Sequence, residues 1–148
     1  MTRKSWGISL LTLPVVALLA TGCTGPTASR PVALAPLEGT SWRADDIDGA
    51  EVVAGVKPTL IFYAGQKVDG FSVCNRYFGT YRQTDDMLEI KPAGMTRMAC
   101  PSAVMDQETR FLAALEAVRK ARREDDTLML LDGAGRVRMR LGLSTRGR

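Results

Sequence analysis

The sequence predicts one α+β domain in which a curved antiparallel β-sheet packs around one main α-helix. Three observations lead to this fold class. Short β-rich runs separated by turns occupy residues 59–90. A single segment, from about Ala103 to Arg122, carries apolar residues at helical spacing. A final hairpin occupies residues 127–142, so the order is strands, one helix and two more strands.

The first strands lie in "PTLIFYAGQKVDGFSV". Thr59–Tyr63 and Lys67–Val73 are β-rich runs with a Gly-containing turn between them. "RYFGTYRQTDDMLEI" then predicts another strand, a polar Asp-Asp turn and a short strand. Gly70 and Gly79 fall within this region and no helix follows either one. We therefore interpret them as bulge or tight-packing positions and not as a phosphate-binding loop.

The helix follows a Pro-Ser pair. Pro101 and Ser102 lie where a helix start is expected. Acidic residues in the early turns and the basic segment Arg119–Arg123 in the last turn match the helix dipole. The apolar positions that predict one buried side are Met105, Phe111, Leu112, Leu115 and Val118.

The hairpin is marked by Asp132-Gly133, a strong turn signal, in a four-residue loop. The strand after it alternates basic and apolar residues, so one face is expected to be buried and the other wet. The wet face is open to two interpretations, a solvated surface or a contact for envelope anions such as lipopolysaccharide phosphates or acidic glycan. The basic positions are Arg136, Arg138 and Arg140, and the apolar ones are Val137, Met139 and Leu141.

The N-terminus reads as an export signal. Residues 1–22 combine Arg3 and Lys4 with an apolar run that is shorter than the ~20 residues of a transmembrane helix. "ALLATGC" resembles a bacterial lipobox, which implies cleavage after Gly22 and lipid on Cys23. An ordinary cleaved signal with a stray cysteine is the alternative. Thr24, and not the Asp typical of inner-membrane retention, follows the cysteine, so we expect a lipid anchor in the outer membrane, facing the periplasm.

The remaining chain divides into a tether, a domain and a tail. Residues 23–36 are rich in Pro and small polar residues and predict a lipidated, flexible tether, although part of it packing on the domain stays open. Residues 37–143 are enough for one modest core. Residues 144–148 form a basic tail. Removing Arg3 and Lys4 lowers the formal charge from +4 to +2, which is mild.

The domain resembles the META domain, the HslJ-like family of small bacterial envelope proteins. "LEGTSW", "GFSVCNRYFGTY" and "GMTRMACP" followed by "QETRFLAALEAV" carry the resemblance, in this order. The family often has Gly where this chain has Val73. The resemblance implies a barrel-like sheet around one helix, frequent lipidation, and a link to stress tolerance and envelope integrity. It brings no catalytic motif.

The cysteines that remain after lipidation are Cys74 and Cys100. The chain has no histidine, which excludes a Cys-His pair, a Ser-His-Asp triad and a His-containing zinc site. In an oxidising compartment two such thiols usually form a disulfide. Two buried free thiols or a redox pair are the alternatives, although the pair lacks CxxC spacing. We expect no metal and no cofactor.

Other candidate residues give weaker signals. The acidic run at 45–48 carries Asp45, Asp46 and Asp48 and predicts a solvated turn, because the glycine and glutamate of a calcium loop are missing. Asn75 is expected to serve a turn. Three tyrosines are expected to be half-buried sheet residues, and four carboxylates are candidate acids or bases without a recognisable arrangement. They are Tyr63, Tyr77 and Tyr81, and Asp69, Asp85, Asp86 and Glu108.

Three function classes follow from these observations. The first is a non-enzymatic envelope lipoprotein that supports outer-membrane integrity under stress through contact. The second is a module that inhibits an enzyme such as lysozyme, which rests on analogy. The third is an enzyme that uses the carboxylates named above. The expected partners are the membrane, through lipid on Cys23, and envelope anions or proteins, and not nucleic acid.

Overall fold

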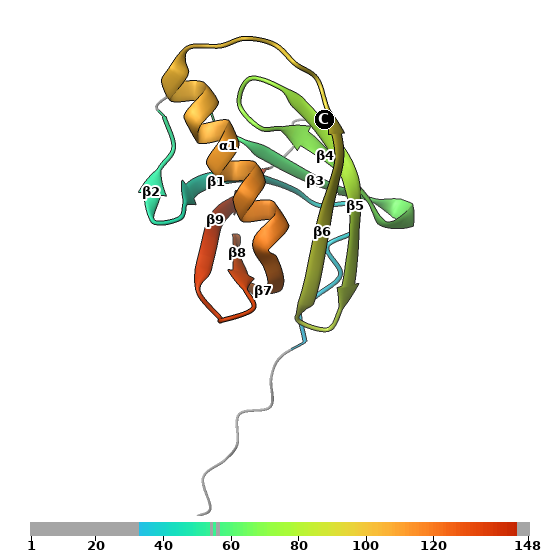
Figure 1. Ribbon diagram of the computed structural model, residues 1–148. Coiled ribbons are helices and arrows are strands. Elements are labelled where there is room, and N and C mark those ends of the chain that lie inside the picture. Colours follow the sequence, from blue (N-terminus) through green and yellow to red (C-terminus); the bar gives the residue numbers. More distant parts are fainter. Residues whose placement is uncertain (1–32, 54, 56, 145–148) are drawn as a thin grey trace, which may run out of the picture. The chain divides into compact units, whose positions relative to one another are not determined.

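The computed structural model describes residues 33–53, 55 and 57–144, which form a curved antiparallel sheet with one long helix (Figure 1). The predicted α+β class with a barrel-like sheet is confirmed. The elements are β1 (Ser41–Ile47), β2 (Ala50–Glu51), β3 (Thr59–Tyr63), the 3₁₀ turn η1 (Ala64–Gln66), β4 (Lys67–Phe71), β5 (Arg76–Thr84), β6 (Met87–Met95), α1 (Ser102–Ala117), β7 (Val118–Glu124), β8 (Thr127–Asp132) and β9 (Val137–Leu143).

In the described part of the chain, eight strands close into a barrel through β1. Trp42 of β1 lies opposite Leu60 of β3 and also opposite Leu143 of β9. Each of the strands β3 to β8 pairs antiparallel with the next strand along the chain. The short β2 pairs with the end of β1. Closure satisfies the backbone groups that an open sheet would expose at its edges.

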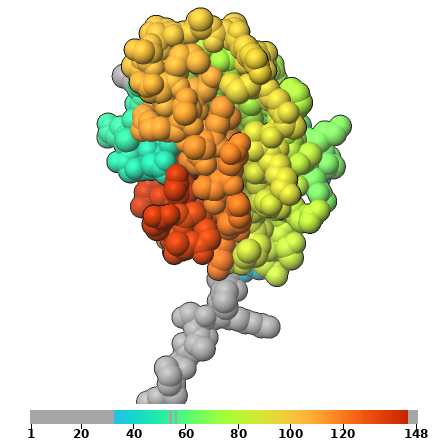
Figure 2. Space-filling model, viewed as in Figure 1, coloured from blue at the N-terminus to red at the C-terminus, as the bar shows by residue number. Residues whose placement is uncertain are grey.

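The strands β6 and β7 share the fewest paired residues in the described barrel. The one residue pair between these strands in the described chain is Met87 with Lys120, beside a hydrogen bond from the Ala121 N–H to the Asp86 carbonyl oxygen. Elsewhere β6 and β7 diverge, and α1, which connects them, covers the opening (Figure 1). Figure 2 shows the outer side of α1 at the surface, with β6 beside it. The helix therefore closes the barrel wall where the strands do not.

Side chains from the inner face of the barrel and from one side of α1 form a single core. Phe111 and Leu115 point from the helix into it, and Phe111 meets the Tyr77 ring edge to face. Buried residues alternate with more exposed ones along β3, β4 and the start of β5, as expected for a sheet with one wet face, whereas β8 has three buried residues in a row. The largest fully buried residues are Trp42, Tyr77, Phe62, Phe111, Leu37, Ile47, Leu60, Leu88, Ile90, Leu115, Leu128 and Leu130.

The two strand glycines occupy positions with no room for a side chain. A Cβ on Gly70 would lie 2.0 Å from the Thr59 carbonyl oxygen, and one on Gly79 would lie 2.2 Å from the Lys91 carbonyl oxygen. The pairing of β5 with β6 also shifts register at Gly79. Tight packing at both glycines and a bulge at the second are therefore confirmed.

Several predicted elements agree with the structure and one does not. β3 has the predicted bounds, and α1 begins at Ser102 directly after Pro101. The helix was expected to reach Arg122, but it ends at Ala117, and the basic segment that follows is strand β7. Arg, Lys and Ala favour a helix locally, but pairing of this segment with β8 across a two-residue Asp-Asp turn overrides that preference.

The domain begins before its expected start. Leu34 and Leu37 are both buried. The Gln83 side chain accepts a hydrogen bond from the Leu37 N–H (2.9 Å) and donates one to the Leu34 carbonyl oxygen (3.3 Å). Residues 34–36, expected to belong to the tether, are therefore held on the barrel. The predicted signal, Cys23, the earlier tether and residues 145–148 lie outside the described residues.

Candidate functional site

The turn between β4 and β5, residues 72–75, contains Cys74, the cysteine of the motif "GFSVCNRYFGTY". Val73 in this turn has φ 139°, a conformation that glycine adopts and β-branched residues rarely do. A residue held in such a region costs about 1–3 kcal/mol and persists when its surroundings fix it. Val73 therefore has the backbone conformation that suits glycine, the residue that often occupies this position in the family that the sequence resembles.

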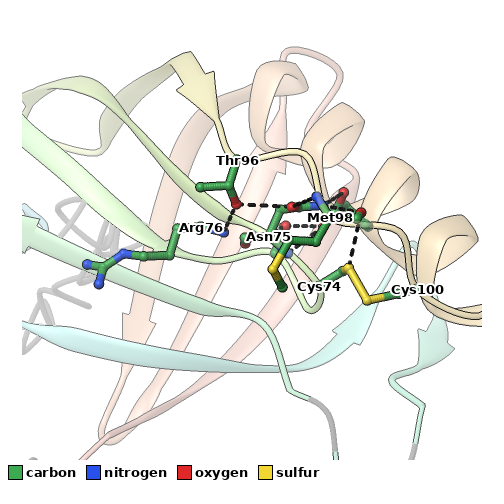
Figure 3. The surroundings of a disulfide bond; sticks show 8 residues. Cys74, Asn75, Arg76, Thr96, Met98 and Cys100 are labelled. Carbon is green, nitrogen blue, oxygen red and sulfur yellow. Dashed lines mark hydrogen bonds between the residues drawn. A yellow bond between two sulfur atoms is a disulfide. The ribbon is translucent and has the colours of Figure 1, made fainter.

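Cys74 forms a disulfide bond with Cys100 (Figure 3). Cys100 lies two residues before Ser102, where α1 begins. Cys74 is buried, and its bond ties the strand turn to the start of the helix. Of the alternatives that the sequence left open for the two cysteines, the structure contains the disulfide.

Glu108 of α1 reaches the same turn from the inside. Its side chain is buried, with 3% of the residue exposed. One carboxylate oxygen accepts hydrogen bonds from the Ser72 hydroxyl and the Asn75 backbone N–H, and the other accepts one from the Asn75 side-chain amide at 2.9 Å. The carboxylate is therefore surrounded by neutral donors, which satisfy it without a salt bridge.

Asn75 connects this carboxylate to the loop that precedes the helix. Its side-chain oxygen accepts hydrogen bonds from the Met98 N–H (2.6 Å) and the Thr96 hydroxyl (3.0 Å). Its amide nitrogen donates to Glu108, as described above. Asn75 thus has the expected role in a turn, and its side chain also links this turn to α1 and to the loop before α1. We call Ser72, Asn75, Thr96, Glu108 and the two cysteines the turn cluster.

The turn cluster is built to hold segments together and not to exchange protons. A general acid or base must reach a substrate proton, either directly or through one water. Glu108 is shielded from solvent and both of its oxygens accept bonds from the protein. Ser72 completes this arrangement and was not recognised in the sequence, because its partner Glu108 lies 36 residues later and no local pattern marks the contact.

The other candidate carboxylates do not join Glu108. Asp69 lies on β4 and pairs with Arg76, whereas Asp85 and Asp86 form the turn between β5 and β6. A surface hollow of about 380 Å³ is lined by two carboxylates, Asp85 and Glu38. Both residues are exposed, so the hollow lacks the burial that separates the roles of two catalytic carboxylates.

The arginine hairpin, which we define as the β8–β9 hairpin with Arg136, Arg138 and Arg140, contains the basic residues expected on the wet face of the last strand. Arg136 lies in the loop before β9 and pairs with Asp132 at 2.8 Å. Arg138 is half-buried and pairs with Asp48 at 2.6 Å. Arg140 is exposed, and no described carboxylate pairs with it. Arg138 and Arg140 therefore lie on β9, whereas Arg136 lies just before it, and two of the three guanidinium groups pair with carboxylates.

Asp132 organises the loop of this hairpin. Its carboxylate accepts hydrogen bonds from the backbone N–H groups of Arg136 and Ala134, and from the Arg136 guanidinium. These interactions, with the Arg136 N–H first, lower the pKa of the Asp132 carboxyl below its ordinary value of 3.8 and outweigh the opposing effect of desolvation. The ion pairs therefore belong to the fold of the hairpin.

The remaining predicted residues have structural partners. Tyr77 and Tyr81 are buried in the barrel, and burial, with a smaller effect of nearby Asp69, raises the pKa of Tyr77 well above 10.0. Tyr63 is more exposed. Asp45, expected in a solvated turn, lies on β1 and pairs with Lys57. Asp46 also lies on β1, and its side chain accepts a bond from the Gly49 N–H in the turn that follows.

The described residues contain no group of three or more Cys, Asp or Glu side chains arranged to hold a metal ion. In the same part of the chain, no helix has the length and apolar character needed to cross a membrane.

The META domain family matches residues 35–144. A protein from Burkholderia xenovorans solved by NMR is 27% identical, with a TM-score of 0.59 over 82% of this chain and 99% of that chain. A crystal structure of a DUF4847 family protein from Bacteroides vulgatus shares the fold, with 11% identity and a TM-score of 0.55 over 75% of this chain and 96% of that chain. No curated protein matches. The chain belongs to the META domain family.

Proposed function

We propose that the protein is a non-enzymatic lipoprotein of the cell envelope, which supports outer-membrane integrity or stress tolerance by contact. The observation that carries this proposal is the turn cluster. It contains three of the five buried polar residues of the described chain, namely Ser72, Asn75 and Glu108, and these groups bond to one another and to the neighbouring backbone. A domain whose buried polar groups are structural acts through its surface.

The location rests on the start of the sequence. A charged segment, a short apolar run and "ATGC" support lipid attachment at Cys23, with the outer membrane favoured by Thr24. More than one acyl chain gives a stable anchor, whereas a single chain is marginal. The anchored domain would then face the periplasm.

The inhibitor alternative gains no support. An inhibitor of a lysozyme-type enzyme needs an acidic or polar loop that enters a cleft. The acidic turns at 85–86 and 125–126 are two-residue hairpin turns, which do not extend beyond their strands. Contact through a broad surface fits the domain better.

Cells that lack the gene can test the proposal, with the full chain or its Cys23→Ser variant returned to them. We expect the wild-type chain to take up a fatty-acid probe, to fractionate with the outer membrane, and to restore exclusion of a dye during envelope stress. The Cys23→Ser variant should lose all three. Label and membrane association that persist in this variant would contradict the anchor, and equal dye exclusion with and without the gene would contradict the envelope role.

A further inference from the structure

Exposed apolar side chains gather on one side of the barrel. Six large hydrophobic residues are exposed in the described part of the chain. Four of them lie on the strands β3 to β6, at positions that alternate with buried residues and therefore point outward. These four are Tyr63, Phe71, Phe78 and Met87.

Strand register brings the two phenylalanines together. Phe78 of β5 lies opposite Asp69 of β4, and Phe71 of β4 lies opposite Arg76 of β5. Residues opposite each other point to the same side of a sheet, and diagonal neighbours lie within reach of aromatic side chains. Phe71 and Phe78 are therefore diagonal neighbours on the outside of the barrel, with Asp69 and Arg76 between them.

Each phenylalanine ring contacts a neighbouring residue of the sheet and also remains exposed to solvent. Gly94 lies opposite Phe78, and a Cβ on this glycine would be 2.6 Å from the Phe78 ring, so the ring lies over the bare backbone. The Arg76 guanidinium carbon lies 5.3 Å from the centre of the Phe71 ring. Figure 3 shows the Arg76 side chain pointing away from the disulfide. Phe71 is 48% exposed and Phe78 58% exposed, although the strands hold both in place.

Cations surround these rings. Lys67 of β4 lies opposite Tyr63 of β3 on one side and opposite Thr80 of β5 on the other. Thr80 in turn lies opposite Lys91 of β6, so these residues form one row across the four strands. No described carboxylate pairs with Lys67 or Arg82, whereas Arg76 and Lys91 have the acidic neighbours Asp69 and Glu89. We call this surface the basic-aromatic face: Tyr63, Phe71, Phe78, Lys67, Arg76, Arg82 and Lys91. Its cations outnumber its acids, so it is complementary to an anionic partner.

We propose that the basic-aromatic face docks on an anionic phospholipid bilayer. A bilayer that carries acidic lipids attracts Lys and Arg through its negative surface potential. Aromatic rings provide the apolar contact at the headgroup level. Lysine is depleted at protein interfaces, so a face in which two of the four cations are lysines suits a lipid surface better than a protein.

The chain enters the domain beside the same strands. Leu34 is held by Gln83 of β5, at the end of the strand that also carries Phe78. An extended chain spans at most ~3.5 Å per residue. The segment 24–33 is therefore long enough for the face to reach the bilayer in which Cys23 would be anchored. In this respect the proposal rests on the proposed function, because the anchor supplies the location of the face.

Vesicle flotation with residues 33–148 tests the docking surface without the anchor. The match covers 99% of the solved chain from Burkholderia xenovorans, so a chain that consists of a similar domain alone folds without further parts. The probes are vesicles of equal parts phosphatidylglycerol and phosphatidylcholine, and vesicles of phosphatidylcholine alone. We expect binding to the anionic vesicles, weaker binding as salt is added, and little binding to the neutral ones.

Two variants remove the two components of the face. Phe71→Ser with Phe78→Ser removes the rings, and Lys67→Gln with Arg82→Gln removes the unpaired cations. We expect each pair to lower the vesicle association constant about tenfold or more. Circular dichroism melts check folding, and Phe71→Ser alone serves if loss of the ring over Gly94 unfolds the domain. Arg136→Gln with Arg140→Gln is the matched control, which removes two cations from the arginine hairpin and should bind like the wild type.

The outcomes separate the possible occupants. Binding by the ring variant or the cation variant that equals that of the wild type, or no binding of the wild type to anionic vesicles, overturns the proposal. A loss as large in the hairpin control assigns the contact to the hairpin and also overturns it. If the ring variant instead abolishes self-association in sedimentation velocity, the face is an interface between copies. None of these failures affects the test of the anchor in cells.

Discussion

The turn cluster and the arginine hairpin both contain a carboxylate with several hydrogen-bond donors, but they hold it in different ways. Glu108 is buried and receives its bonds from a hydroxyl, a backbone N–H and an amide. Asp132 is also shielded, with 6% of the residue exposed, but it is bonded by backbone N–H groups and by the guanidinium of Arg136, which is itself exposed. Buried groups that lose a partner carry the full cost of desolvation, whereas exposed ion pairs contribute little. The difference predicts that stability is concentrated in the turn cluster.

The largest expected effect is that of Glu108→Ala. It removes the acceptor to which the Ser72 hydroxyl, the Asn75 N–H and the Asn75 amide all donate. The hydroxyl keeps the Asn75 carbonyl oxygen at 2.9 Å and the amide keeps the Met98 carbonyl oxygen at 3.4 Å, whereas the buried N–H loses the carboxylate outright. We expect the free energy of unfolding to fall by about 3–5 kcal/mol, since each buried unsatisfied group costs about 1–3 kcal/mol. Urea unfolding measures the change. Glu116→Ala on the exposed side of the same helix is the matched control and should change little. A similar loss in both variants would contradict the special role of the buried carboxylate.

Removal of the disulfide is expected to have a comparable but smaller effect. Cys74 and Cys100 are 26 residues apart in the sequence. Loop-closure entropy for a ring of this length predicts that Cys74→Ser with Cys100→Ser lowers the free energy of unfolding by about 3.5 kcal/mol. Urea unfolding of the wild type with a thiol reductant should approach the value of the double variant. An unchanged midpoint in both experiments would show that the polar bonds alone hold the turn.

A gain in stability is expected from Val73→Gly. The wild-type residue has φ 139°, and glycine adopts such a conformation without a steric penalty. The relief of strain exceeds the extra entropy of glycine in the unfolded chain, so we expect a net increase of about 1 kcal/mol in the free energy of unfolding. Val53→Gly, at a position without positive φ, should lower stability instead. A loss at both positions would show that packing of the Val73 side chain outweighs the strain.

The smallest effect is expected at the arginine hairpin and depends on pH. The pKa of Asp132 is lowered in the folded protein, so its carboxylate stabilises the fold above the unfolded-state pKa. This contribution disappears as the pH falls through the lower pKa of the folded state. Asp132→Asn should therefore be less stable than the wild type at neutral pH, and the two should converge below about pH 4. Thermal melts across this range measure the difference. A constant gap down to strong acid would contradict this assignment.

The sequence predicted the elements that depend on neighbours in the chain. The bounds of β3, the Pro101–Ser102 helix start and the four-residue loop after Asp132 all follow from local turn and periodicity signals. The strand β7 does not follow from local signals, because its basic residues are also good helix formers and it forms a strand through pairing with β8. Local propensity is a weak guide where pairing supplies the missing hydrogen bonds.

The candidate site was predictable only in part. The cysteine pair and Asn75 were recognised by composition and resemblance, but the bonds between Asn75, Glu108 and Ser72 join residues that are distant along the chain. The alternation around Arg138 indicated a wet face, but Asp48, which pairs with it, lies 90 residues earlier. The basic-aromatic face needs the register of four strands before its rings and cations come together. Contacts of this kind become visible only when the barrel is closed.

The pairing of β1 with β9 determines when the chain can finish folding. The first strand of the barrel has to wait for the last, since Trp42 lies opposite Leu143. Until β9 has been synthesised, β1 and β8 present open edges that can pair with other chains. Barrels with such non-local contacts fold slowly. The seven residues of β9 therefore decide when a newly made chain is protected from aggregation through these edges.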